Sequence, residues 1–249
     1  MRFEELTIEG RNAVLEAYKS GKPIDKLFVQ EGSRDGSIQT ILKEARNNDT
    51  VVQFVSKERL DGMSTTGGKH QGVIAYGAAY EYAEVEDILK NAADKNEDPF
   101  VLILDGIEDP HNLGAIIRTA CQAGAHGVII PKHRAVGLTA TVARTSAGAL
   151  NYVPVAKVTN IAQTIEDLKH KGMWFACADM DGEVMYRANL TGSIGLVIGN
   201  EGEGVSRLVK EKCDFTVSIP MKGQIDSLNA SVAAGVLSYE VVRQRMCKK

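Results

Sequence analysis

The sequence predicts an α/β protein with a larger C-terminal domain built on a mostly parallel sheet and a smaller N-terminal α/β domain. Short β-branched runs without alternation, such as residues 100–104 and 195–198, are typical of strands buried on both faces of a parallel sheet. Helical segments separate most of these runs, as such a sheet requires. Polar, glycine-rich segments follow the last two strands. Because ligands collect at the carboxyl ends of parallel strands, we expect the binding site between these segments.

The N-terminal domain is predicted over residues 1–76. Helical spacing covers residues 10–19 and 37–47, short apolar strands are expected at 26–30, 51–55 and 72–76, and a capped helical turn is expected at 56–60. This alternation predicts a compact domain with a partly parallel sheet. Residues 77–98 are acidic and are expected to form a linker or a connecting helix.

The C-terminal domain is predicted over residues 99–249. Six strands are expected at 100–104, 127–130, 153–155, 173–178, 196–198 and 215–219. A helix should begin at Pro110, capped by Asp109 or Asn112, and end near residues 123–125, and a last helix should cover residues 233–246.

Composition narrows the class of protein. No stretch reaches 18 consecutive apolar residues and the N-terminus is too acidic for a signal peptide, so we expect a cytoplasmic protein. The four cysteines are widely spaced and we expect them to be reduced, with no metal site. The net charge of −3 excludes a strongly basic nucleic-acid binder. Residues 99–249 hold 16 Lys/Arg and 14 Asp/Glu, so any RNA contact must come from local patches.

The glycine-rich segment 199–204, GNEGEG, does not match a nucleotide-phosphate template. It carries two carboxylates where a phosphate cradle needs bare N–H groups, and neither GxxxxGK[ST] nor GxGxxG occurs. An acidic turn of this kind suits a cationic ligand or one held by backbone contacts.

Three segments carry a family resemblance: DPHNLGAIIRTA at 109–120, GNEGEGVS at 199–206 and IPMKGQIDSLNASVAAGVLSYE at 219–240. They resemble, in the same order, the signature motifs of the SpoU (TrmH-like) RNA 2′-O-methyltransferases of the SPOUT superfamily. The resemblance implies S-adenosyl-L-methionine as methyl donor and a ribose hydroxyl of RNA as acceptor. It also implies a trefoil knot in the C-terminal domain, which general topology rules would not predict.

Matched position by position, the resemblance implies a set of site residues. The catalytic set is Asn112, Arg118, Glu201, Ser227 and Asn229, and the cofactor-binding set is Gly199, Ile219 and Leu228. The residues alone allow plainer roles. Arg118 lies about 140° from Leu113 on its helix, which favours a solvated arginine, and Ser227 or Asn229 could simply cap the last helix.

The role of Arg118 has two interpretations. The family's arginine is proposed as the base that removes the ribose proton. An arginine side chain rarely loses its proton, however, so an electrostatic role toward the substrate phosphate and oxyanion is equally open.

The loop at residues 65–72 is either a plain surface loop or an RNA contact through Lys69, His70 and Gln71. The N-terminal domain resembles the ribosomal-protein-like substrate-binding domain that precedes many SpoU-type domains. The favoured function is therefore methylation of a guanosine ribose in large-subunit ribosomal RNA. The alternatives are a transfer-RNA ribose methyltransferase and a non-catalytic RNA-binding factor.

The resemblance also implies a homodimer formed through the C-terminal domain. The last helix supports it, because its side chains leave more apolar surface than one sheet face covers. These side chains are Val232, Val236, Leu237, Tyr239, Glu240 and Val241.

Overall fold

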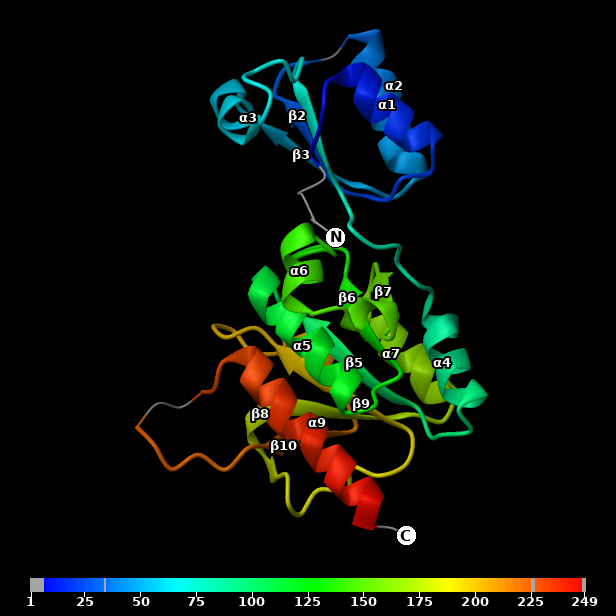
Figure 1. The fold of residues 1–249 in the computed structure, drawn as a ribbon. Coiled ribbons are helices and arrows are strands. Elements are labelled where there is room, and N and C mark those ends of the chain that lie inside the picture. The colour runs from blue at the N-terminus through cyan, green and yellow to red at the C-terminus, as the bar shows by residue number, and fades with distance from the viewer. Residues whose placement is uncertain (1–6, 34, 225–226, 248–249) are drawn as a thin grey trace. The chain divides into compact units, whose positions relative to one another are not determined.

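The computed structural model describes residues 7–33, 35–224 and 227–247, which fall into two compact units (Figure 1). One unit contains the chain up to residue 81 together with residues 137–143, and the other contains residues 82–136 and the chain from 144 onward. The four cysteines are free. Within the described ranges, no helix is both long and apolar enough to span a bilayer.

The N-terminal unit has a four-stranded mixed sheet in the order β1-β4-β2-β3. Strands β2 and β3 are parallel and β4 is antiparallel to both β1 and β2, so the predicted partly parallel sheet is confirmed. Strand β1, three half-buried residues, was not predicted. The strands are β1 (Thr7–Glu9), β2 (Ile24–Gln30), β3 (Val51–Val55) and β4 (Val73–Gly77), and the helices are α1 (Arg11–Lys19), α2 (Gly36–Asn47) and α3 (Lys57–Met63).

The helices of this unit cover both faces of its sheet (Figure 1). Helices α1 and α2 place Val14, Ile38 and Ile41 against Leu27 and other residues of β2 and β4. Helix α3 covers the opposite face through a separate apolar cluster, formed by Phe28, Val55, Leu60 and Ile74. The predicted helical turn at 56–60 is the start of α3, where the Ser56 hydroxyl accepts a hydrogen bond from the Arg59 amide.

The loop between α3 and β4 is fixed at its start by one carboxylate. Glu9 of β1 accepts hydrogen bonds from the hydroxyls of Ser64, Thr65 and Thr66 and from the Thr65 amide, at 2.6–2.7 Å. Desolvation alone would raise the pKa of Glu9, but these hydrogen bonds outweigh it and lower the pKa to about 2. The carboxylate form therefore stabilises the folded loop.

Replacing Glu9 with glutamine is expected to loosen this loop, because a neutral amide accepts weaker hydrogen bonds. The expected loss is about 1–2 kcal/mol, the scale for hydrogen bonds to a charged group. In the wild type, the same stability should be lost as the pH falls from about 4.5 toward about 2, because the folded-state pKa lies below its ordinary value. Amide hydrogen exchange at Thr65 and Gly68 measures the effect. Glu16→Gln, at an exposed pair with Lys19, is the control, and equal protection in both variants would contradict the prediction.

The C-terminal unit has a six-stranded sheet in the order β10-β8-β9-β5-β6-β7, and every strand pair is parallel. The central strands are buried on both faces, as the sequence predicted. The strands are β5 (Phe100–Asp105), β6 (Gly127–Pro131), β7 (Val155–Val158), β8 (Trp174–Val184), β9 (Ile194–Gly199) and β10 (Phe215–Ser218).

The helices of this unit lie on both faces of the sheet (Figure 1). They are α4 (Val85–Asp94), α5 (Pro110–Gln122), α7 (Ile161–His170), α8 (Arg207–Lys212) and α9 (Ala230–Cys247), with a 3₁₀ turn at Ala149–Asn151. Helix α6 (Ala140–Thr145) is divided between the two units, because the boundary falls after residue 143. Helices α5 and α9 pack against each other, and Gly235 of α9 lies close to Thr119 of α5. Asp109 caps α5 by accepting a hydrogen bond from the His111 amide, which decides between the two predicted caps.

The structure also adds to the predicted elements. Residues 77–98 contain α4, whose Ile88 is fully buried and packs so closely on Gly127 that a Cβ there would lie 2.4 Å from it. Strand β8 continues to Val184, well beyond the predicted end at residue 178, because it pairs with β10 again after a register shift. The trefoil knot stays a prediction from the resemblance.

The strand order of the C-terminal sheet shows where a ligand is expected to bind. After β5 the chain moves outward to β6 and β7, whereas β8, β9 and β10 lie on the other side of β5. The carboxyl ends of β5 and β9 are adjacent, and Asp105 pairs in register with Gly199. A reversal of strand order at this point leaves a crevice outside the strand ends, where open α/β sheets bind ligands.

Candidate functional site

Three side chains from distant parts of the chain meet at the carboxyl edge of the sheet. Asn112, in the first turn of α5, donates from Nδ2 to Oε1 of Glu201 at 3.0 Å. Asn229, directly before α9, donates from Nδ2 to Oδ1 of Asn112 at 2.9 Å and also to Oε1 of Glu201. The Ala230 amide donates to the same Glu201 oxygen at 3.3 Å. One carboxylate thus ties together the starts of both helices.

Asn229 also caps α9. Its Oδ1 accepts hydrogen bonds from the amides of Ser231 and Val232 at 3.0 and 3.3 Å and from the Ser231 hydroxyl at 2.6 Å. The capping role and the network role therefore belong to different atoms of one amide. This arrangement fixes the side chain in one orientation.

The loop after β9 folds back on the end of its own strand. A Cβ on Gly199 would lie 2.0 Å from the carbonyl carbon of Gly204, so only glycine fits this close approach. The Asn200 side chain accepts hydrogen bonds from the amides of Gly202 and Glu203 at 2.9 and 2.6 Å, which closes the turn. The Ser206 amide donates to Asp105 at 2.8 Å and anchors the far end of the loop to β5.

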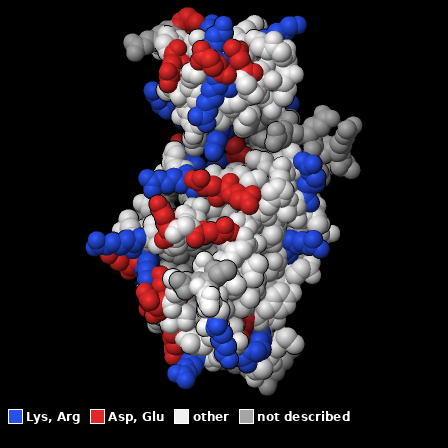
Figure 2. All heavy atoms as spheres, turned by 90° about the vertical axis from the view of Figure 1, so that its left-hand side faces the viewer, with Lys and Arg blue, Asp and Glu red and all other residues white. Residues whose placement is uncertain are grey.

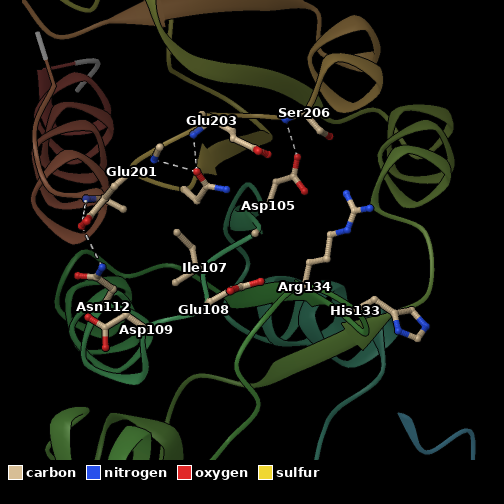
Figure 3. A pocket seen from close by; sticks show the side chains of 15 residues that line it. Asp105, Ile107, Glu108, Asp109, Asn112, His133, Arg134, Glu201, Glu203 and Ser206 are labelled. Carbon is tan, nitrogen blue, oxygen red and sulfur yellow. Dashed lines mark hydrogen bonds between the residues drawn. The ribbon is translucent and has the colours of Figure 1, made fainter. Parts of the chain in front are cut away.

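A cavity of about 760 Å³ opens between this loop and the segments that follow β5 and β6 (Figure 3). Its wall carries five carboxylates and one arginine, so its surface is mainly a hydrogen-bond acceptor. The charged and polar lining side chains are Asp105, Glu108, Asp109, Asn112, His133, Arg134, Asn200, Glu201, Glu203 and Ser206.

A second cavity of about 280 Å³ lies beside the first, at the ends of β8, β9 and β10. Residues 200–204 and Ala230 line both cavities, so the two share a wall. The smaller cavity is more apolar, with Ile198, Val217 and Leu237 among its lining residues. Gly199, Ile219, Ser227 and Leu228 also line it, which brings the predicted cofactor residues and Ser227 to one place.

Asp179 brings an ion pair with Lys210 to the wall of the smaller cavity. Its carboxylate accepts a hydrogen bond from Nζ of Lys210 at 2.6 Å, and this contact, more than any other, lowers the pKa of Asp179. The group is therefore ionised at neutral pH. Because Lys210 balances this charge, the net negative charge at this end of the site comes from Glu201 and Glu203.

Comparisons with known proteins give the family. The model of the SpoU rRNA Methylase family matches residues 99–239, and the model for RNA 2′-O ribose methyltransferase substrate binding matches residues 7–83. The chain belongs to the SpoU rRNA methylase family. It is therefore an RNA methyltransferase of the SpoU/TrmH type, as the sequence motifs predicted.

Relatives and solved structures agree with this family. YacO of Bacillus subtilis, named for the TrmH family of tRNA/rRNA methyltransferases, is 52% identical over 238 residues, which cover 95% of this chain and 94% of YacO. The SpoU methyltransferase AviRb from Streptomyces viridochromogenes, solved in complex with AdoMet, matches at a TM-score of 0.61 and 26% identity over 98% of this chain and 91% of AviRb. The A. aeolicus TrmH/SpoU tRNA modifying enzyme matches at a TM-score of 0.56 and 27% identity over 65% of this chain and 85% of that enzyme.

Within the described part of the chain, Arg118 forms no hydrogen bond with Asn112, Glu201 or Asn229. Its side chain is exposed on α5, two turns beyond Asn112, and it lines neither cavity. The prediction that it points away from the apolar stripe of its helix is consistent with this exposure. A catalytic role for Arg118 stays a prediction.

In the loop predicted to contact RNA, only two of the three predicted residues are exposed to solvent. Lys69 and Gln71 are exposed, and Gln71 has a left-handed backbone with φ of 53°. His70 is buried, with Nε2 2.9 Å from Asp61 and Nδ1 accepting from the Gly72 amide at 3.0 Å. Both ring nitrogens are engaged within the unit, so in this conformation His70 fixes the turn before β4, and its contact with RNA stays a prediction.

Sequence reasoning missed the residues that complete the larger cavity. Asp105 is the last residue of β5, Glu108 follows it, and His133 and Arg134 follow β6. Since the rule that ligands bind at the carboxyl ends of parallel strands applies to every strand, it could have found them. On the face shown in Figure 2, acidic and basic side chains of the described residues are interspersed and form no continuous basic area.

Proposed function

We propose that this chain methylates a ribose 2′-hydroxyl in RNA with S-adenosyl-L-methionine as methyl donor. The observation that supports the proposal most strongly is the meeting of Asn112, Glu201 and Asn229 on the wall between two adjoining cavities. A group-transfer enzyme needs a donor pocket and an acceptor pocket that share a boundary.

The smaller cavity suits the donor. Its apolar floor, with Ile198, Ile219 and Leu228, offers packing surface for an adenine ring, and Gly199 lines the same cavity. The carboxylates of Glu201 and Glu203 suit the positive charges of a sulfonium and an amino group. When bound, the cofactor supplies an electrophilic methyl group. AviRb, which shares the fold over nearly the whole chain, was solved with AdoMet.

The larger cavity suits the acceptor nucleotide, whose base and ribose present hydrogen-bond donors to its carboxylates. Asn112 and Asn229 hold Glu201 at the shared wall, and Ser227 lines the donor side. Arg118 acts either as the base that takes the ribose proton or as a stabiliser of the oxyanion and substrate phosphate. In both roles it must approach the substrate from the exposed surface of α5.

Large-subunit ribosomal RNA, at a guanosine, is the favoured substrate. The family model that matches residues 99–239 is named for rRNA methylases, and the match to the A. aeolicus tRNA modifying enzyme covers only 65% of this chain. The substrate-binding model at residues 7–83 accounts for this additional unit. Transfer RNA is the second candidate, because YacO is named for a tRNA/rRNA methyltransferase family.

The N-terminal unit is proposed to bind the RNA, with Lys69 and Gln71 as exposed hydrogen-bond donors on its glycine-rich loop. Ribose-methylation mapping of RNA from a strain lacking the protein tests the whole proposal. One ribosomal ribose should lose its methyl group and regain it when the wild-type gene returns. Loss in a transfer RNA would select the second candidate, and no change in any RNA would favour a non-catalytic RNA-binding factor.

We also propose a homodimer formed through α9. Leu237, Glu240 and Val241 are buried within the unit, so they are no longer available to a second copy. Val232 and Tyr239 are exposed at 50% and 53% and share one helix face with half-buried Val236. We expect light scattering to give a dimer for the wild type and a shift toward monomer for Tyr239→Glu. A stable wild-type monomer at micromolar concentration would contradict the proposal.

A further inference from the structure

The larger cavity carries one permanent positive charge among its described lining residues, the guanidinium of Arg134. Five lining side chains are carboxylates, from Asp105, Glu108, Asp109, Glu201 and Glu203. Within the described part of the chain, the Arg134 side chain forms neither a hydrogen bond nor an ion pair with these or other residues. A guanidinium that stays unpaired beside so many acids is available to an anion from outside.

Arg134 is held in place by its backbone. It has a φ of 55°, a left-handed conformation that a residue with a side chain adopts at a cost. On either side of it, the Lys132 amide donates to the Val158 carbonyl at 2.8 Å and the Val136 amide donates to the Ile107 carbonyl at 3.0 Å. The segment is thereby tied both to β7 and to the loop after β5. Backbone strain that the surroundings maintain in this way is typical of functional positions.

Figure 3 shows Arg134 and His133 on the side of the cavity opposite Asn112 and Glu201. The two ends of the cavity therefore differ in charge. Carboxylates favour the hydrogen-bond donors of a base or a ribose and repel a phosphate, whereas Arg134 favours a phosphate. A nucleotide that enters this cavity therefore has one favourable orientation, with its base and ribose toward the carboxylates and its phosphate toward Arg134.

We infer that Arg134 binds a backbone phosphate of the RNA substrate and so orients the acceptor nucleotide, with its ribose directed toward the Asn112–Glu201–Asn229 end. His133, exposed beside it, offers a second donor to the same strand. Arg134 lines the larger cavity and not the smaller one, so its contact is with RNA and not with the methyl donor. The inference rests on the proposed function in that RNA is the substrate. It assigns Arg134 a positioning role.

The test compares Arg134→Ala and Arg134→Lys with Arg187→Ala, an exposed arginine of the same unit that lines neither cavity. Binding of transcribed large-subunit ribosomal RNA is measured over a range of salt concentrations. Arg134→Ala should weaken binding about tenfold and reduce the slope of log K against log salt by about 0.7–0.9, as expected for one lost phosphate contact. Arg134→Lys should keep the slope, and Arg187→Ala should match the wild type.

Calorimetric titration of S-adenosyl-L-methionine and a thermal melt accompany the binding curves. Cofactor affinity within about twofold of the wild type supports a role toward RNA, whereas its loss in Arg134→Ala would overturn that role. An unchanged salt slope and RNA affinity would overturn it too, as would an absence of salt-dependent RNA binding by the wild type. Failure of the wild type to transfer a methyl group refutes the proposed function instead, because the binding curves decide the role of Arg134 without any turnover.

Discussion

Arg118→Ala is expected to slow single-turnover methyl transfer by about 10²-fold or more while leaving the fold almost unchanged. A decrease of this size in the rate is typical when an enzyme loses its general base or an oxyanion donor. The stability effect should stay within about 0.5 kcal/mol, because the side chain is exposed on α5 and makes no described contact that the fold depends on. Cofactor affinity should change only a few-fold, since Arg118 does not line the smaller cavity.

Transfer from labelled cofactor to transcribed ribosomal RNA measures this effect, with calorimetry and a thermal melt on the same variant. Gln122→Ala is a matched control, because Gln122 is exposed one turn later on the same helix. Arg118→Lys tests whether the planar guanidinium is needed, since a lysine keeps the positive charge and loses the bidentate geometry. Near-wild-type transfer by a well-folded Arg118→Ala would remove Arg118 from the mechanism.

The fold of the larger unit could be predicted because its strands obey a simple rule. Residues 100–104 are apolar without alternation, and in the structure β5 is buried on both faces. The N-terminal strand β1 could not be found in this way, because three half-buried residues carry no period. Helix α4 was left open as a linker or a helix, since the acidic composition of residues 77–98 conceals the fact that Ile88 packs in the core.

The motifs could predict which residues belong to the candidate site, but not which of them are in contact. Nothing in the spacing of Asn112, Glu201 and Asn229 shows that they touch, because the contact depends on two strands ending side by side at Asp105 and Gly199. The sequence also gives no sign that His70 is buried, because its burial depends on how a loop closes, which composition does not determine.

Asn229→Asp is expected to reduce methyl transfer at neutral pH by about 10²-fold while keeping the cap of α9, because the two roles of Asn229 lie on different atoms. A carboxylate at this position still accepts the amide hydrogen bonds of Ser231 and Val232, and its charge is favourable at a helix N-terminus. It loses the donor to Asn112 and Glu201, however, and places a second negative charge against the Glu201 carboxylate.

The pH profile of Asn229→Asp distinguishes a network role from a purely structural one. As the pH falls, one proton shared between the two carboxylates restores a donor, so the activity of the variant relative to the wild type should rise on the acid side. Asn229→Ser is the companion variant, since serine also caps helices but supplies no second donor at this distance. The free energy of unfolding of both variants should lie within about 1 kcal/mol of the wild-type value. Asn229→Ala should lose about 1 kcal/mol more than these two variants, because it also removes the helix cap. Wild-type transfer rates in a stable Asn229→Asp protein would show that the contact with Glu201 only positions the helices and has no part in the reaction.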